Sequence, residues 1–309
     1  MARYLLHRFV QGVVVLALVA VVVFVVSRLS GNPVNQMLPE NATPEQREAL
    51  TRSLGLDQPL TTQFARFVGG ILTGDFGHSH RFAAPALDLV LSRVGNTVAL
   101  ALAGLALAVV AGLTLGVLSG LRQGSHLDRV ITAVVTVGQS VPSFWIGILL
   151  ILVVGVQLKA LPFAGASTPE SIVLPALTLS VVPTVSIARV TRSSVVETLQ
   201  MDHIRTARAK GLRTGELVRR HVLRNAAVPV LTITGLLLTE AVGGAVITER
   251  VFAWPGIGSL AVEAIAVRDY AVVQTITLVV AAAVVVVGVL VDLAYMAVDP
   301  RIRMTGAAR

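Results

Sequence analysis

The sequence predicts an all-α membrane protein with six transmembrane helices and a helical extracytoplasmic insertion. Three observations lead to this prediction. The 309-residue chain is 54% hydrophobic and only 14% charged, whereas soluble domains carry roughly 25% charged residues. It also contains six apolar stretches close to the length of about 20 residues that a bilayer-spanning helix needs. Finally, the basic residues gather in a few of the loops between these stretches.

The six stretches have approximate boundaries that can be read from the run of apolar residues. They are Phe9–Leu29, Thr97–Leu121, Val130–Leu158, Ser171–Val190, Val228–Thr248 and Ala271–Leu293. The first follows Arg3 and Arg8, as a signal peptide would. Its apolar run of about 20 residues is longer than a signal h-region, and no small-residue cleavage site follows. We therefore expect it to be a retained helix.

The distribution of basic residues predicts the orientation. One side of the membrane collects both termini and the loops around residues 121–129 and 189–225, with 16 of the 25 Lys and Arg residues. Short basic loops stay in the cytoplasm, so both termini are expected to be cytoplasmic. Because the positive charge flanks membrane spans, membrane lipid and not nucleic acid is expected among the partners.

The expected organisation has three parts: residues 1–29 (tail and first span), 30–96 (extracytoplasmic insertion) and 97–309 (a five-helix core with a cytoplasmic loop at 193–226). In the insertion, Thr43 is placed to cap a helix that starts at Pro44 and ends before Gly55. A second helix is expected from Pro59. Its apolar face would hold Phe64, Phe67, Val68, Ile71 and Leu72. The stretch "APALDLVLSRVGNT" then predicts an interfacial amphipathic helix before the second span.

The cytoplasmic block from Ile204 to Asn225 holds seven basic residues and one acid. It has three possible roles: setting topology, attracting anionic lipid, or docking onto a cytoplasmic protein. The local sequence favours docking. Asp202 is placed to cap a short helix and Gly211 to end it in a left-handed conformation, while Ala207 and Ala209 allow a close approach. "RTARAKG" lacks the large apolar residues that a lipid-binding segment needs.

This loop reads "HIRTARAKGLRTGELVRRHVLRNAAVPV", and it resembles the permease subunits of the ABC importers for dipeptides, oligopeptides and nickel. The resemblance covers almost the whole chain, through "RYLLHRFVQGVVVL", "LGLDQPL", "GDFGHS", "GQSVPSFWIGILLIL", "LPALTLS", "VFAWPGIGSLAVEAIAVRDYAVVQ" and "VDLAYMAVDPRIR". The chain looks like a B-type permease of a peptide importer, such as the dipeptide permeases. This implies the type I permease fold of ABC importers and a place in the bacterial plasma (inner) membrane.

The resemblance also implies an ATPase-coupling segment in the loop. Its expected members are Asp202, Arg205, Thr206, Ala207, Arg208, Ala209, Lys210, Gly211 and Leu212. The superfamily motif of Glu-Ala-Ala, three residues and Gly, ending in Leu-Pro, aligns on Gly211. Arg205 and Thr206 then stand where Glu and Ala would lie, so a salt bridge made by that Glu is not expected here.

The same resemblance implies the partners. They are a second permease subunit, two ATP-binding cassette subunits, an extracytoplasmic solute-binding protein and a peptide substrate. ATP and Mg²⁺ would bind to the ATPase subunits, and no cofactor is expected in this chain. A P-loop needs Gly-Lys-Ser/Thr, and neither lysine of this sequence, Lys159 or Lys210, lies in one. The chain is therefore expected to be a transport subunit and not an enzyme.

Four polar residues in the spans are candidates for the translocation pathway: Gln139, Ser140, Ser143 and Glu240. The first three surround Pro142, which would break the third span; they either face the pathway or pack helices. Glu240 lies in mid-span, where a carboxylate is costly unless it is solvated or paired. It either lines the pathway or is a neutral acid bonded to a neighbouring helix.

Other functional classes have weaker support. The chain has no cysteine, which excludes thiolate metal sites, and His78 and His80 are too few donors for a metal site. Trp254 is expected to be an aromatic anchor at the outer interface. The alternatives are a permease for nickel or another small solute, a proton-coupled secondary transporter that uses Glu240, and a membrane scaffold. Secondary transporters usually show internal repeats, which this sequence lacks.

Overall fold

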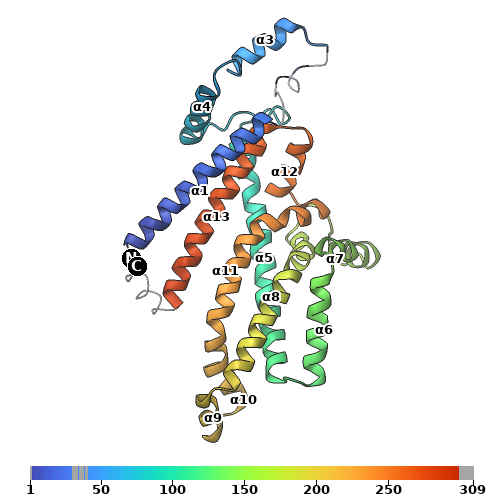
Figure 1. The fold of residues 1–309 in the computed structure, drawn as a ribbon. Coiled ribbons are helices and arrows are strands. Elements are labelled where there is room, and N and C mark those ends of the chain that lie inside the picture. The colour runs from blue at the N-terminus through green and yellow to red at the C-terminus, as the bar shows by residue number, and fades with distance from the viewer. Residues whose placement is uncertain (1, 30–33, 35–37, 39–40, 299–309) are drawn as a thin grey trace. The chain divides into compact units, whose positions relative to one another are not determined.

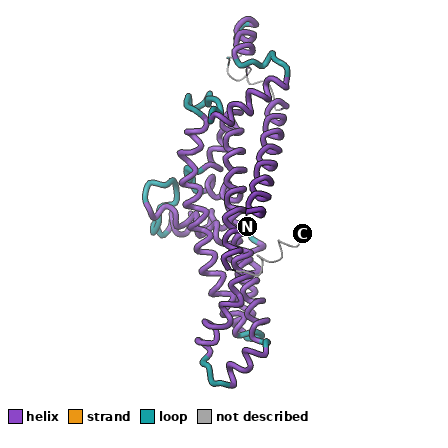
Figure 2. The backbone as a smooth tube through the Cα atoms, turned by 90° about the vertical axis from the view of Figure 1, so that its left-hand side faces the viewer, coloured by secondary structure: helices purple, strands orange, loops and turns teal. Residues whose placement is uncertain are grey.

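The computed structural model describes residues 2–29, 34, 38 and 41–298, and within these residues the chain is built from helices and loops (Figure 2). It divides into two compact units. Unit 1 holds residues 1–96 and 255–286, and unit 2 holds residues 97–254 and 287–309. These two units are defined by packing alone. The expected division into a first span (1–29), an extracytoplasmic insertion (30–96) and a five-helix core (97–309) remains a prediction.

Unit 1 is made of short helices around the ends of longer ones. Its elements are α1 (Ala2–Leu29), α3 (Pro44–Ser53), α4 (Leu60–Thr73), the start of α5 (Ala86–Leu121), α12 (Ile257–Ala266) and the start of α13 (Tyr270–Val298). The predicted caps of α3 are confirmed. Thr43 forms a capping box with Gln46, Pro44 occupies the first turn, and Gly55 has a φ of 64°. Helix α4 follows Pro59 as expected, but Leu72 is 81% exposed and does not share a buried face with Phe64 and Phe67.

The core of unit 1 joins segments far apart in the sequence. Ala86 and Val90 at the start of α5 are buried against Leu260 of α12 and Val272 of α13. The expectation of an interfacial amphipathic helix in this region is therefore wrong, because its apolar residues pack against protein within one continuous helix. The loop before α5 is fixed by Asp269, which accepts a hydrogen bond from the buried Ser79 hydroxyl.

Unit 2 contains the longer helices and the cytoplasmic loop. Its elements are the rest of α5, α6 (His126–Ser140), α7 (Ser143–Leu150), a π-helical segment (Ile151–Gln157), a 3₁₀ turn (Pro169–Ile172), α8 (Val173–Leu199), α9 (Asp202–Ala209), α10 (Thr214–Leu217), a second π-helical segment (Val218–Val222) and α11 (Leu223–Val251). Helix α8 is central, in contact with α6, α7, α9 and α11 (Figure 1).

The contact between α5 and α8 depends on glycines. A Cβ atom added at Gly112 would lie 2.7 Å from Ile187, and one added at Gly116 would lie 2.5 Å from Thr191. Real side chains cannot approach that closely, so small residues are what allow the two backbones to pack together, as in other membrane helix pairs. Ile131 and Val135 of α6 cover another face of α8.

Within the part of the chain that the structure describes, four helices are long and apolar enough to cross a membrane, and the number rises to six if two bent helix pairs each count as one span. One bent pair is His126–Ser140 with Ser143–Gln157, which meet at 99°. The predicted break of the third span by Ser140, Pro142 and Ser143 is therefore present, with Pro142 directly before α7. The chain is an all-helical membrane protein, with four to six candidate spans among its described residues.

Trp254 does not have the predicted position. Its side chain is only 5% exposed and packs against Leu100 and Ala176 inside unit 2. An indole is amphipathic and suits either a membrane interface or a core with a partner for its N–H. The observed burial fits a core residue and leaves little of the indole surface to act as the aromatic anchor that the sequence predicts.

Candidate functional site

Helix α9, at the centre of the predicted coupling segment, begins differently from the sequence expectation. Met201 is the N-cap, with extended backbone angles and no capping side chain, and Asp202 is the first helical residue. The backbone carbonyl of Met201 accepts hydrogen bonds from the amides of Ile204 at 3.0 Å and Arg205 at 3.3 Å. Asp202 is thus not the cap. It still places a carboxylate in the first turn, where the helix dipole favours negative charge, and it lies 3.8 Å from the Arg205 guanidinium.

The C-terminal end of α9 confirms the role predicted for Gly211. Its φ is 82°, its amide donates to the Arg208 carbonyl at 2.9 Å, and the Leu212 amide donates to the Ala207 carbonyl at 3.3 Å. These two bonds form the Schellman arrangement, which satisfies carbonyls left open by the last turn. The arrangement turns the chain sharply toward α10.

The inward face of α9 is packed into unit 2. Ile204 is fully buried and Ala207 is 8% exposed. They join Val195 of α8 and Leu217 of α10 in one apolar cluster, which Leu212 also contacts. The side chain of Ala207 is therefore used for packing within this chain, in contrast to the expectation that it leaves space for a partner.

The outward face of α9 and the turn after it carry the exposed residues of the predicted coupling segment. These are all exposed: Asp202, Arg205, Thr206, Arg208, Ala209, Lys210 and Gly211. Three cations face solvent with one carboxylate, so the surface is positive and surrounds the small side chain of Ala209. Such a surface is complementary to a negatively charged concave surface.

A partly buried ion pair joins the hairpin between α5 and α6 to α8, the helix that leads into α9. The Arg192 guanidinium donates to both carboxylate oxygens of Asp128, at 2.8 Å and 2.9 Å. Ser119 also donates to this carboxylate, and the Gly124 amide donates to it at 2.9 Å. The Asp128 side chain is only 6% exposed. Local sequence patterns do not predict this ion pair, because Asp128 and Arg192 lie 64 positions apart.

The pathway candidates lie on open surfaces of unit 2. Gln139 and Ser140 are exposed at the end of α6, Ser143 is half-buried at the start of α7, and Glu240 is exposed on α11. The exposure of Glu240 favours a solvated or partner-facing carboxylate over one packed inside this chain. Among the described side chains, no hydrogen bond joins Glu240 to the residues around the α6–α7 break.

The fully buried carboxylate of α11 is a different residue, which sequence reasoning missed. Glu249 has no exposed surface, and its Oε1 accepts a hydrogen bond of 2.6 Å from the Thr97 hydroxyl at the start of the unit 2 part of α5. Its place near the end of an apolar run gave no sign of burial. Only the pairing of α11 with α5 brings the hydroxyl to it.

Comparison with known proteins assigns the family. Residues 112–304 match the family model for the binding-protein-dependent transport system inner membrane component, and residues 1–102 match the model for the N-terminal part of such membrane components. A putative peptide permease of Brucella suis is 41% identical over 99% of this chain and its own full length. The oligopeptide transport system permease AppB of Bacillus subtilis is 35% identical over 98% of this chain and 99% of the relative.

Two further comparisons agree with this family assignment. The glutathione transport system permease GsiC of Escherichia coli K12 is 36% identical over 98% of this chain and 99% of its own length. An inward-facing form of the MetNI methionine ABC transporter has a similar fold, with a TM-score of 0.56 at 21% identity over 68% of this chain and 96% of that one. The exposed helix α9, the polytopic fold and these matches lead to one conclusion. As a multi-pass permease subunit of an ABC importer, this chain is a transport subunit and not an enzyme, and it works with an ATPase and other transporter subunits. The chain belongs to the family of binding-protein-dependent transport system inner membrane components.

Proposed function

We propose that this chain forms half of the translocation pathway of an importer for short peptides, and that α9 is its coupling helix. The assembly would contain a second permease, two ATP-binding cassette subunits and an extracytoplasmic solute-binding protein. The observation that carries the proposal is the two-sided character of α9. One face is exposed and cationic, and the other is buried in a cluster shared with α8 and α10.

The two faces of α9 give a physical route for coupling. A cleft in the ATPase would hold the exposed residues, with Arg205, Arg208 and Lys210 facing its acidic groups. When the ATPase closes on ATP and Mg²⁺, the cleft moves and α9 moves with it. Because Ile204 is fully buried against the α8 cluster, α9 cannot shift without displacing α8, and close-packed interiors transmit such displacements.

The ion pair between Asp128 and Arg192 supports the next step of this route. It connects α8 to the α5–α6 hairpin by two hydrogen bonds, so a movement of α8 would also move α6. Helix α6 ends at Ser140, at the break between α6 and α7, and Ser143 begins α7 on the other side of that break. We therefore place Gln139, Ser140 and Ser143 on the pathway wall, together with the exposed Glu240.

Short peptides are the substrate class that the comparisons favour. The named relatives include peptide, oligopeptide and glutathione permeases, and glutathione is itself a tripeptide. Peptides carry an ammonium group, which the Glu240 carboxylate could attract during passage. Nickel or another small solute is the alternative cargo.

The proposed topology has six spans, each bent pair counting as one, and both termini in the cytoplasm of a bacterial inner membrane. Residues 30–96 would then face outward and meet the solute-binding protein. Residues 193–226 would form the cytoplasmic coupling loop. The concentration of basic residues around α9 supports this orientation.

The test has two parts. First, the tagged chain is purified in mild detergent, and a stoichiometric ATPase is expected with it. Replacing Arg205 and Arg208 with Glu should release that ATPase, whereas Arg122→Glu, which changes an exposed arginine on another loop, should not. Retention of the ATPase by the double variant would contradict the coupling role.

Second, uptake is measured in vesicles that contain the complete transporter. Labelled dipeptides and tripeptides should enter in an ATP-dependent manner and compete with one another. Uptake of nickel without uptake of peptides would overturn the substrate assignment while leaving the coupling role intact.

A further inference from the structure

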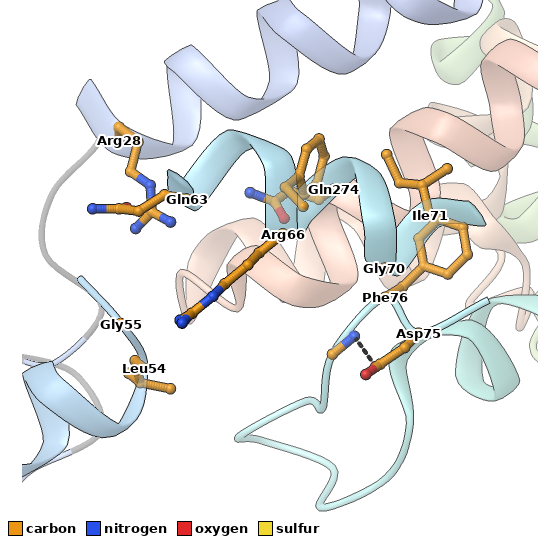
Figure 3. Close-up of a pocket in the computed structure, with 12 residues that line it drawn as sticks. Arg28, Leu54, Gly55, Gln63, Arg66, Gly70, Ile71, Asp75, Phe76 and Gln274 are labelled. Carbon is orange, nitrogen blue, oxygen red and sulfur yellow. Dashed lines mark hydrogen bonds between the residues drawn. The ribbon is translucent and has the colours of Figure 1, made fainter. Parts of the chain in front are cut away.

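Unit 1 contains a cavity of about 380 Å³ that the transport mechanism does not use (Figure 3). It lies between α1, α4, the turn after α3 and the start of α13. Its polar lining includes Arg28, Gln63, Arg66, Asp75 and Gln274. The volume is at the lower end of the range for small-molecule pockets, which suits a ligand group of modest size.

Two arginines contribute positive charge to this cavity from different helices. The Arg28 guanidinium, at the end of α1, lies over the Phe24 ring at 5.3 Å from its centroid. The Arg66 side chain extends from α4 toward the turn after α3 (Figure 3), and a Cβ atom added at Gly55 would lie 2.2 Å from its Nη1 atom. A side chain at position 55 would displace the flexible end of Arg66 from this place.

Among the described residues, neither arginine is paired with a carboxylate. Within the described part of the chain, no acidic group lies within ion-pair distance of Arg28 or Arg66. The acid in the lining, Asp75, is exposed, and its Oδ1 accepts a hydrogen bond from the Gly77 amide at 3.0 Å. Gln63 is only 8% exposed, and its Oε1 atom is buried without a partner among the described residues. Unpaired cations and an unsatisfied buried oxygen are typical of a polar site that a ligand or water completes.

The position of the cavity indicates the source of the ligand. Arg28 stands at the end of the apolar span Leu6–Leu29, which places it at the depth of lipid headgroups. Large apolar side chains are exposed on the same two helices: Leu29 of α1 and Leu72 of α4 are each 81% exposed, and Leu60 of α4 is 63% exposed. Acyl chains could cover these side chains while a headgroup enters the cavity.

We propose that this cavity binds the phosphate group of a phospholipid headgroup from the surrounding membrane. The N–H groups of Arg28 and Arg66 donate to the phosphate oxygens, because a guanidinium matches phosphate in charge and in geometry. The aromatic contacts of Phe24 with Phe64 and Phe67, at centroid distances of 5.2 Å and 5.7 Å, hold α1 against α4 so that both arginines reach one site. The bound lipid would tie α4 to the end of α1, and this role does not depend on which cargo the transporter carries.

The experiment uses the full chain, purified in mild detergent with the subunits it retains. Native mass spectrometry counts the phospholipids that stay bound. After delipidation, a defined phospholipid is titrated back, with inorganic phosphate as the competing source of the same chemistry. We expect one tightly held phospholipid per chain and no displacement by inorganic phosphate.

Replacing both Arg28 and Arg66 with Gln should weaken rebinding at least tenfold. Arg52→Gln is the matched control, because Arg52 belongs to the same unit but is already paired with Glu48 at 2.5 Å. A second variant, Gln274→Glu, keeps both arginines and adds a carboxylate to the cavity wall. In the native protein the Gln274 amide donates a hydrogen bond to the Ser27 hydroxyl at 2.7 Å. In the variant the Ser27 hydroxyl can donate to the new carboxylate instead. This variant should also release the lipid.

Unchanged lipid retention in both variants would overturn the proposal. Displacement of the lipid by inorganic phosphate would also overturn it, by assigning the cavity to a soluble anion. Equal loss of lipid in Arg52→Gln would show that general surface charge, and not this cavity, holds the lipid.

Discussion

Replacing Gly211 with Val should uncouple transport from ATP hydrolysis while leaving the protein inserted and folded. The φ of Gly211 is 82°, and a Cβ atom added there would meet no other heavy atom within 4 Å. The cost of the substitution is therefore conformational and not steric crowding by neighbours. A left-handed backbone costs an L-residue roughly 1–2 kcal/mol, and a β-branched residue such as Val is a genuine outlier there.

This cost acts locally on the end of α9. Because about 1.4 kcal/mol corresponds to a tenfold change in an equilibrium, the native turn should lose about tenfold in population relative to opened forms. Opening breaks the bonds from the amides of Gly211 and Leu212 and displaces the exposed cations of α9. The thermal midpoint should change little, because Gly211 itself is exposed and the buried cluster around Ile204 remains.

The assay is substrate-stimulated ATPase activity and uptake in reconstituted vesicles, with membrane insertion measured in parallel. We expect both activities to fall several-fold in Gly211→Val. Gly211→Asn should retain more activity, because Asn tolerates the left-handed region. Gly215→Val is the matched control: Gly215 lies in α10 without a positive φ, and an added Cβ meets nothing within 4 Å. Normal coupling in Gly211→Val, or an equal loss in Gly215→Val, would refute the reasoning.

Three further predictions follow from the same structure. A double-mutant cycle on Asp128→Asn and Arg192→Gln should give a coupling energy of about 2–3 kcal/mol in unfolding measurements, between the values for exposed and fully buried pairs; a coupling near zero would show that the pair does not join α6 to α8. Asp57→Cys, which introduces a single cysteine into a chain that has none, should be labelled by an impermeant thiol reagent in intact cells, and labelling only after lysis would invert the proposed topology. Glu240→Gln should fold as well as the parent and alter peptide uptake; if Glu240→Leu raised stability and both variants transported normally, Glu240 would have no place on the pathway.

Local features were predictable from the sequence because each depends on a few neighbouring residues. The Thr43 cap, the helix after Pro59, the break at Pro142 and the left-handed Gly211 follow from backbone chemistry that acts within one helical turn. The number and length of the apolar stretches likewise follow from bilayer thickness. Two apolar helix pairs nevertheless bend at a break, and the angles of these bends were not evident from hydropathy.

The direction in which each side chain faces was decided only by the tertiary structure. In a soluble protein an apolar residue points inward, but in a membrane span both the lipid-facing and the protein-facing sides are apolar. The sequence therefore could not show that Trp254 is buried or that Ala207 packs inward. Nor could it distinguish Glu240, which is exposed, from Glu249, which has no exposed surface.

The contacts that assemble the candidate sites are also tertiary. Asp128 meets Arg192 across 64 residues, and Ser79 meets Asp269 across 190. The lipid cavity joins Arg28 of α1 to Arg66 of α4. The sequence by itself determined a basic, glycine-ended helix in a membrane protein, because those properties are local. Which faces of that helix are buried and which cations share a cavity depended on the packing of distant helices, because no local interaction encodes a contact between residues so far apart in the chain.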